Sequence, residues 1–151
     1  MIVFKNILVP TDGSEMSRKA ALKAVALAKS VGARVTGFHV APAYHPQVND
    51  DYYIPRDYLS PTQFAAKTKE VAEKYLGSIA KAATAGAVRY DAHYVNSDFP
   101  ADAIVKAAKK YKCDAIVMAS HGRTGLSRLF LGSQTQKVIA STKLPVVVLR
   151  T

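Results

Sequence analysis

The chain alternates between two hydrophobic periodicities along its whole length, and this alternation limits the folds that it can adopt. Short runs rich in β-branched or aromatic residues, bounded by Pro, Gly, Asp or Asn, predict five strands. Longer runs between them repeat apolar residues every three or four positions and predict four helices. A β-α-β-α order is typical of a doubly wound α/β domain, a parallel sheet with helices on both faces.

The expected elements follow from where each periodicity begins and ends. In the first helix, Lys19 and Lys23 should face solvent while Leu22, Val25 and Ala26 point inward. The chain of 151 residues fits one domain, residues 1–151. We expect strands at residues 2–9, 34–40, 88–95, 115–119 and 146–149, and helices at residues 15–31, 61–85, 99–111 and 133–141.

Composition favours a soluble cytoplasmic protein. No apolar run approaches the ~20 residues that a membrane-spanning helix needs, and the N-terminus lacks the features of a signal peptide, so no membrane partner is expected. The single cysteine, Cys113, cannot form an internal disulfide and precedes an apolar strand. We interpret it as a buried, unreactive thiol.

The net charge of +10 raises the question of an anionic partner. Basic residues are scattered from Lys5 to Arg150, and the densest group, Lys106, Lys109, Lys110 and Lys112, lies on and just after one helix. A solvated helix face explains this group. Nucleic acid is therefore not an expected partner unless the fold gathers basic residues on one face.

One segment, residues 41–60, is too long for an ordinary strand-to-helix turn and contains three prolines, three acidic residues and four tyrosines. It is a candidate lid or a loop for a protein partner. Alternatively, its tyrosines cover the end of the sheet.

Two loops could form a ligand site, since doubly wound sheets bind ligands beyond the carboxyl ends of strands where the strand order reverses. One loop follows the first strand as residues 9–14, and the other spans residues 119–133. In the second loop, Gly122 and Gly125 allow close approach of the backbone to an anion, and Arg123 and Arg128 add charge. Gly132-Ser133 stands at a predicted helix start, which favours phosphate.

Simpler roles remain open for the same residues. Ser133 could be a plain N-cap, and Asp12 could cap the first helix together with Ser14 instead of binding a ribose hydroxyl or Mg²⁺. A hydrolytic trio of Ser120, His121 and Asp12 is not expected, because adjacent side chains on an extended segment point apart. No Walker-type loop, dinucleotide fingerprint, nucleophile elbow or paired histidine spacing for zinc occurs.

At these residues the sequence resembles the universal stress protein family, over essentially the whole chain. The opening ILVPTDGS, the stretch IVMASHGRTGLSRLFLGS and the closing LPVVVL each look like that family's motifs. Its nucleotide-binding members carry Gly-x2-Gly-x9-Gly-Ser/Thr, and Gly122 and Gly132-Ser133 keep this spacing. Ala119 replaces the first glycine and adds a methyl group near the expected phosphate path.

The resemblance implies a five-stranded parallel sheet of order 3-2-1-4-5 that binds ATP, with Mg²⁺ as an accompanying metal. Gly122, Gly132 and Ser133 would lie at the phosphates and Asp12 near the ribose or metal. Backbone around Pro10, Thr11 and Val40 would lie at the adenine, and the candidate site extends to Met118, Ala119, His121, Arg123 and Gln134.

The resemblance also implies a homodimer and a stress or signalling role with no strong catalytic constellation. In the expected order the last strand, Val146 to Leu149, is an apolar and uncharged sheet edge, which pairing with a second copy would cover. We therefore expect no catalytic residues and at most slow ATP hydrolysis. The alternative is a protein-interaction module of the same fold that binds no nucleotide; an ATP-dependent adenylating enzyme rests on fold analogy only.

Overall fold

The computed structural model describes residues 4–45, 60–121 and 131–150. Its elements alternate strictly between strand and helix, as predicted. In order they are β1 (Asn6–Thr11), α1 (Glu15–Val31), β2 (Arg34–Ala41), α2 (Pro61–Ala85), β3 (Tyr90–Asn96), α3 (Pro100–Lys110), β4 (Ala115–Ala119), α4 (Ser133–Ser141) and β5 (Val146–Leu149).

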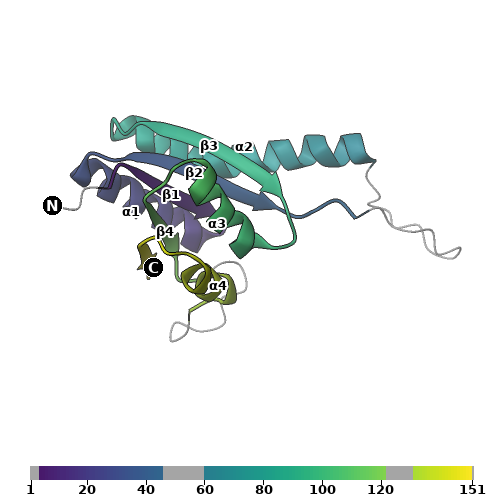
Figure 1. The fold of residues 1–151 in the computed structure, drawn as a ribbon. Helices are drawn as coiled ribbons and strands as arrows, with labels where there is room; N and C mark the ends of the chain where they lie inside the picture. The colour runs from purple at the N-terminus through teal and green to yellow at the C-terminus, as the bar shows by residue number, and fades with distance from the viewer. Residues whose placement is uncertain (1–3, 46–59, 122–130, 151) are drawn as a thin grey trace, which may run out of the picture.

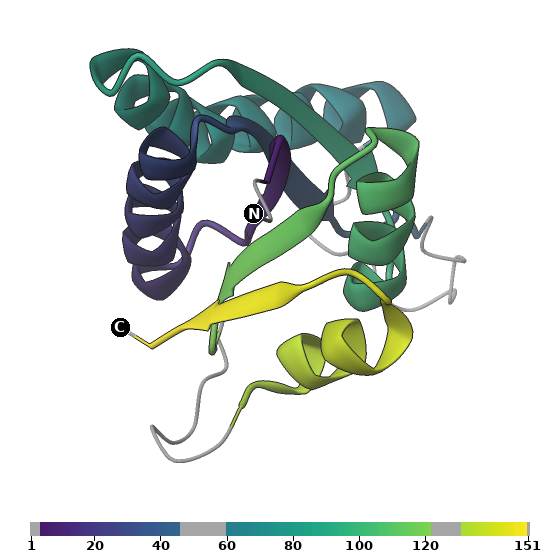
Figure 2. The same cartoon turned by 60° about the vertical axis from the view of Figure 1, so that its left-hand side comes forward.

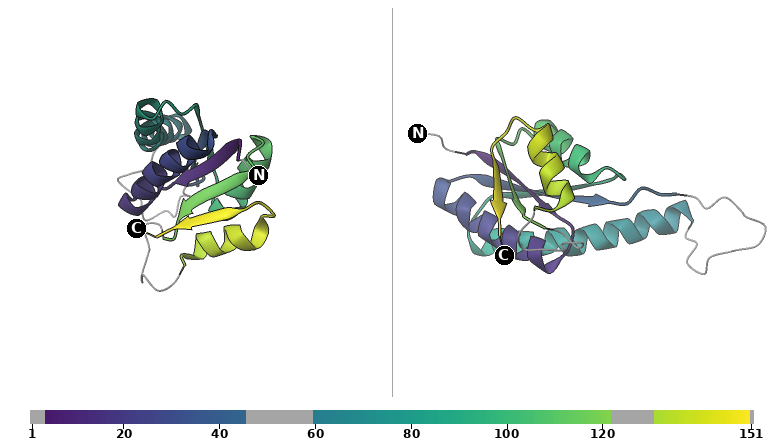
Figure 3. Two further views of the ribbon diagram at one scale, coloured as in Figure 1. Left: turned by 90° about the vertical axis from the view of Figure 1, so that its left-hand side faces the viewer. Right: turned by 90° about the horizontal axis from the view of Figure 1, so that it is seen from below.

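The strands form one five-stranded sheet in the order β3-β2-β1-β4-β5, which confirms the expected fold class (Figure 1). Every strand pair is parallel, so all carboxyl ends lie at one edge of the sheet and all amino ends at the other. We call these the carboxyl edge and the amino edge. α1 and α2 cover one face of the sheet and α3 and α4 cover the other (Figures 2 and 3).

The core has two layers because successive side chains of a strand point to opposite faces. Ile7, Val9 and Val117 pack toward α1 and α2, whereas Leu8 and Ile116 pack toward α3 and α4. All five are at most 1% exposed. The central strands are therefore apolar on both faces, as their sequences indicate.

The first strand lies later in the chain than expected. We predicted that this strand ends at Val9, because proline is typical of a strand boundary. In the structure β1 stays paired with β2 as far as Thr11. Its pairing with β4, in contrast, covers only Ile7 and Leu8. Pro10 follows the last residue of β1 that pairs with β4, so its missing N–H falls beyond the end of that ladder.

The buried face of α1 is also rotated from the expected one. Val25 is buried, but Leu22 is 43% exposed and Ala26 is exposed. The buried stripe consists mainly of alanines, including Ala21, Ala24 and Ala28, which let the helix lie close to the sheet. β3 begins at Tyr90 instead of residue 88, because Val88 belongs to the turn that precedes it.

The other elements agree with the sequence within one residue. β4, β5, α2 and α4 have the predicted bounds, β2 is longer by one residue at its end, and α3 is shorter by one residue at each end. Cys113 is buried as expected, and burial raises the pKa of its thiol. None of the helices in the described ranges is long and apolar enough to cross a bilayer. Most of the predicted lid, residues 46–59, lies outside the described residues.

Candidate functional site

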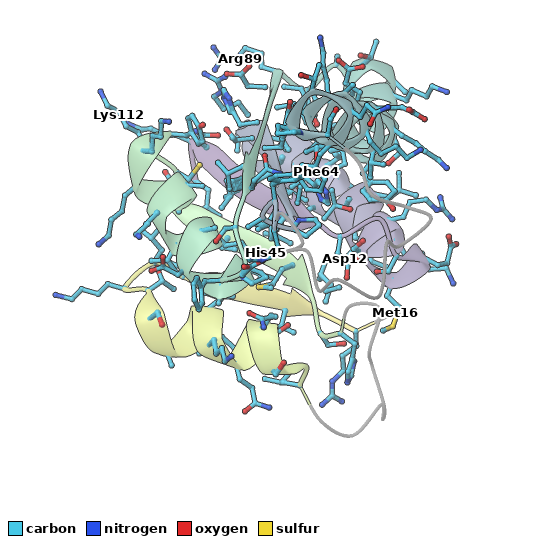
Figure 4. All side chains as sticks on the ribbon, turned by 90° about the vertical axis from the view of Figure 1, so that its right-hand side faces the viewer. Asp12, Met16, His45, Phe64, Arg89 and Lys112 are labelled. Atoms are coloured by element: carbon cyan, nitrogen blue, oxygen red, sulfur yellow. The ribbon has the colours of Figure 1, made fainter. Side chains whose placement is uncertain are left out.

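The carboxyl edge is where the winding of the sheet reverses. The chain winds outward from β1 to β2 and β3, then crosses back to β4 and β5, so the reversal falls between β1 and β4. These are the two strands that part beyond Leu8. Asp12 directly follows β1, and Ser120 and His121 directly follow β4, so these residues lie at the carboxyl edge, on which Figure 4 labels Asp12. Ligands of doubly wound sheets bind at such a point.

The loop from β1 to α1 is held by a network of short polar side chains. Gly13 N–H donates to Thr11 Oγ1 (3.2 Å), and Ser14 N–H donates to Asp12 Oδ1 (2.9 Å). Ser14 is the N-cap of α1 and accepts from Ser17 N–H (3.1 Å). Because the Ser17 hydroxyl donates to Ser14 O (3.0 Å), the Thr11 hydroxyl must donate to Ser17 Oγ (3.1 Å). This network fixes the backbone on either side of Asp12.

Two aromatic side chains contact this loop, and neither was predicted from the sequence to belong to the site. His39 is 5% exposed, and its Nδ1 lies 2.8 Å from Thr11 O. A carbonyl only accepts, so Nδ1 carries the proton and donates. The Tyr75 ring meets His39 edge-on at 5.2 Å and lies against Gly13, where an added Cβ would fall 2.2 Å from the ring. Gly13 has φ +78°, so it needs glycine for both its conformation and its contact.

The start of α4 forms the opposite side of the site. The helix begins at Ser133, as the sequence predicted, but its N-cap is Gly132 and not Ser133, and the Gly132 N–H donates to Ser120 O at 2.7 Å. A Cβ on Gly132 would lie 3.1 Å from that oxygen, so the close approach to β4 selects glycine. The first helical bond of α4 is from Gln136 N–H to Gly132 O. The amides of residues 133–135 have no backbone acceptor within the described part of the chain, as expected of a helix N-terminus that can receive an anion.

Ser120 and His121 contact each other, and the expectation that they point apart is wrong. Ser120 Oγ lies 3.0 Å from His121 Nδ1. Strand alternation ends at Ala119, so it does not govern the next two residues. His121 is 7% exposed, and its Nε2 is buried with no hydrogen-bond partner among the described residues. Such an atom costs about 1–3 kcal/mol, so a polar ligand at this edge would be stabilised by satisfying it.

Asp12 serves the fold whether or not it serves a ligand. Its Oδ1 accepts the N–H of the α1 N-cap residue, which agrees with the capping role that the sequence left open. Nearby, Arg18 binds Glu15 through two hydrogen bonds and holds the pKa of that carboxyl below its usual value. Within the described ranges, no three His, Cys, Asp or Glu side chains gather as metal ligands. A metal at Asp12 would therefore need ligands other than these side chains.

The remaining predicted residues divide into three groups. Ser133 is exposed and is the first helical residue, not the N-cap, while the Gln134 side chain accepts from Ala101 N–H (3.2 Å) at the start of α3. Val40 is half-buried at the end of β2, and Met118 and Ala119 are each 7% exposed at the end of β4. The predicted residues Gly122, Gly125, Arg123 and Arg128 lie outside the described residues.

The sequence places the chain in a family whose members share this architecture. Residues 4–150 match the Universal stress protein family. A universal stress protein of Thermus aquaticus is 39% identical over 149 residues, covering 98% of this chain and 100% of the relative. The Bacillus subtilis universal stress protein YxiE is 31% identical over 151 residues, covering 98% and 100%. The chain therefore belongs to the universal stress protein family.

Solved structures share the fold over nearly the whole chain. The structure of protein MJ0577 has a TM-score of 0.78 at 28% identity and covers 99% of this chain and 98% of its own. A universal stress protein in complex with cAMP has a TM-score of 0.67 at 21% identity, covering 99% and 98%. An Archaeoglobus fulgidus universal stress protein in complex with dAMP has 0.62 at 20%, covering 97% and 98%.

Proposed function

We propose that this protein binds an adenine nucleotide, ATP with Mg²⁺, at the carboxyl edge of the sheet. It acts in the cytoplasm as a stress-response or signalling dimer that hydrolyses ATP slowly or not at all. The observation that carries the proposal is the start of α4. Gly132 is fixed against β4, and the amides of residues 133–135 have no described backbone acceptor at the edge where β1 and β4 part.

Each side of the site has a role in this proposal. Gly122, Gly132 and Ser133 bind the phosphates, and the buried Nε2 of His121 lies at the same edge. Asp12 is placed by the loop network to accept from the ribose or to hold the metal. The backbone around Pro10, Thr11 and Val40 lines the adenine. The family members solved with cAMP and with dAMP support adenine nucleotides as the ligand class.

Calorimetric titration with Mg-ATP tests the proposal directly. We expect binding by the wild type and its loss in Gly132→Val, because a Cβ at Gly132 lies 3.1 Å from Ser120 O and would push α4 away from β4. Gly77→Ala is the matched control, since nothing lies within 4 Å of a Cβ there, and it should bind like the wild type. No heat at millimolar ATP would contradict the proposal and favour the nucleotide-independent interaction module. ATP retained in the purified protein would contradict that alternative.

The dimer is proposed to form through β5. Its four residues, Val146–Leu149, are uncharged and only half-buried, and β5 pairs on one side with β4. Pro145 O and Leu149 O accept from β4, so by alternation Val146 and Val148 direct their N–H and C=O to the free edge. An apolar edge of this kind needs a covering partner, and a second β5 supplies one.

Sedimentation velocity on Val148→Pro tests the dimer. Proline at this position removes an outward N–H without touching the bonds to β4, so we expect a folded monomer. Val147→Pro removes an inward N–H instead and should destabilise the sheet itself. A wild type that sediments as a monomer at about 100 μM would contradict the proposed dimer.

A further inference from the structure

The amino edge of the sheet carries most of the net charge of the chain. It consists of the amino ends of the strands and the carboxyl ends of the helices, at residues 5–6, 29–34, 84–91, 109–114 and 142–145. These segments contain eight basic and two acidic residues, a formal charge of +6 out of the chain's +10. The basic residues are Lys5, Lys29, Arg34, Arg89, Lys109, Lys110, Lys112 and Lys143.

The fold brings together residues that are scattered along the sequence, because each crossover returns the chain to this edge. Figure 3, left, shows the side of the molecule where β2 and β3 begin, and Figure 4 labels Arg89, just before β3, and Lys112, just before β4. We call this set of segments the basic edge surface. Nucleic acid was not an expected partner because the basic residues are scattered along the sequence. The fold places eight of them along one edge of the sheet.

The two carboxylates of this surface are already engaged. Asp114 accepts the backbone N–H groups of Lys5 (2.8 Å) and Asn6 (3.1 Å), and Asp91 pairs with Arg34 at 3.4 Å. The side chains of the other seven basic residues form no ion pair with any residue that the structure describes. All seven are exposed. Their charge is therefore available to an external anion.

Helix dipoles explain only part of this charge. Lys29, Lys109 and Lys110 stand in last turns of helices, where cations offset the negative end of the dipole. Four helices end at this edge, and at about half a charge each they supply roughly −2. About +4 of the +6 remains uncompensated. Moreover, Lys112 occupies a left-handed turn position (φ +55°) that glycine would adopt more easily.

The surroundings of the charge indicate which polyanion fits. The large apolar side chains that are exposed in the described residues are Leu22, Tyr94, Phe99 and Ile139, and none belongs to the basic edge surface. A membrane-binding surface needs apolar anchors as well as charge. Single-stranded nucleic acid needs exposed aromatic rings for stacking, whereas the Tyr111 ring here is stacked on His93 at 3.8 Å. Charge without anchors or stacking platforms suits the phosphate backbone of a duplex.

We propose that the basic edge surface binds the phosphate backbone of double-stranded DNA without reading its sequence. The sheet edge spans about 19 Å at ~4.8 Å per strand spacing. A duplex carries one phosphate charge per ~1.7 Å of axis with both strands counted, so this width spans about 11 phosphates, of which about half face one side. Four or five simultaneous lysine or arginine contacts are therefore geometrically reasonable. The site is on the opposite edge from the proposed nucleotide site, so it does not depend on that function.

Fluorescence anisotropy of a labelled 20-base-pair duplex, titrated at several KCl concentrations, tests the proposal. Four or five contacts predict a slope of about −4 for log affinity against log salt, or roughly 200-fold weaker binding at 200 than at 50 mM. Two duplexes of unrelated sequence should bind equally. The triple variant Lys109→Gln, Lys110→Gln, Lys112→Gln should reduce the slope by about 2–3 and weaken binding at least tenfold at low salt.

The matched control changes three lysines to glutamine on the far half of α2, at Lys67, Lys69 and Lys74. These residues lie 11 to 18 positions before the end of the helix, or about 16–27 Å, beyond the ~10 Å screening length at 0.1 M salt. This variant should bind DNA within about threefold of the wild type. Circular dichroism of both variants verifies that each is folded.

Three results would overturn the proposal. One is no binding at 50 mM KCl with about 200 μM protein, since non-specific DNA binding normally falls well within that range. Another is equal weakening in the control and in the amino-edge variant. The third is binding to vesicles of phosphatidylserine and phosphatidylcholine with none to DNA, which would identify a membrane surface instead.

Discussion

The two edges of the sheet differ in the groups that they would offer to the phosphates of the two proposed ligands. At the carboxyl edge, helix N-termini and glycine-containing loops offer backbone N–H groups held in place by buried contacts, as at Gly132 and Ser120. At the amino edge, long exposed side chains such as Arg89 and Lys112 offer charge without fixed geometry. Both result from one topology, because parallel strands with helical crossovers send every helix N-terminus to one edge and every C-terminus to the other. Fixed amides suit one small ligand, whereas mobile cations suit a polymer.

The largest loss of stability is expected from a substitution of Gly13, at the carboxyl edge. Gly13→Ala places a Cβ at φ +78° and 2.2 Å from the Tyr75 ring, so we expect a loss of about 2–4 kcal/mol in the free energy of unfolding. Urea denaturation measures it. Gly77→Ala, in an uncrowded helical position of α2, should instead stabilise by about 0.5–1 kcal/mol. A Gly13→Ala protein as stable as the wild type would show that the loop under Asp12 is not rigid.

A buried imidazole on the same edge should have the next largest effect. His39→Phe removes the N–H that Thr11 O accepts, leaving a buried carbonyl unpaired, and should lower the free energy of unfolding by about 1–3 kcal/mol. It should also weaken Mg-ATP binding, because Thr11 precedes Asp12. His93→Phe is the control, since His93 is partly exposed and its ring lies flat on Tyr111. Equal losses of stability and of Mg-ATP binding in the two variants would show that His39 has no role specific to the site.

Periodicity predicted the architecture well because it reports burial, and burial follows strand and helix geometry. β4 and α4 have their expected bounds, since a short apolar run and a Gly-Ser start are local features. β1 was misplaced at Pro10, because tolerance of that proline depends on where β4 departs, and that is a property of the sheet. The inward face of α1 was rotated because alanines, which carry little hydrophobic signal, form its buried stripe.

The candidate site was less accessible to sequence reasoning. Spacing indicated the two loops, but Tyr75 reaches Gly13 from α2, about 60 residues later, and no local pattern predicts that contact. His39 did leave a signal, as a polar residue inside an apolar strand. The charge at the amino edge was missed for the same physical reason as Tyr75. Lys5, Lys29 and Lys143 come to the same edge of the sheet only through the crossovers.

Two turn positions at the amino edge allow the effect of a glycine on stability to be compared with the effect of losing a charge on DNA binding. Lys112 and Ala87 both occupy left-handed positions, at φ +55° and +54°. Lys112→Gly and Ala87→Gly should each stabilise by about 0.5–1 kcal/mol, the cost of a side chain at such an angle less the added entropy of glycine in the unfolded chain. Thermal unfolding measures this gain. Only Lys112→Gly should lower the salt slope for DNA, by about 1, and an equal change in both would mean that the turns and not the charge control binding.

The part-buried hydroxyl of Tyr90, which lies between β2 and α2, should produce the smallest effect, and only at alkaline pH. Its Oη donates to Leu76 O at 2.9 Å, and burial, with a further contribution from Asp91, raises the pKa of its phenol above the usual value near 10. Above about pH 10 the unfolded chain loses this proton while the folded protein keeps it, so the stabilisation is complete below that pH and declines above it. Tyr90→Phe removes this contribution and should show a shallower fall in unfolding free energy between pH 9 and 11. Urea titrations of both proteins measure the difference, in which titrations common to the two cancel. Parallel curves would mean that Tyr90 ionises as readily in the folded protein as in the unfolded chain, and that water reaches its hydroxyl between β2 and α2.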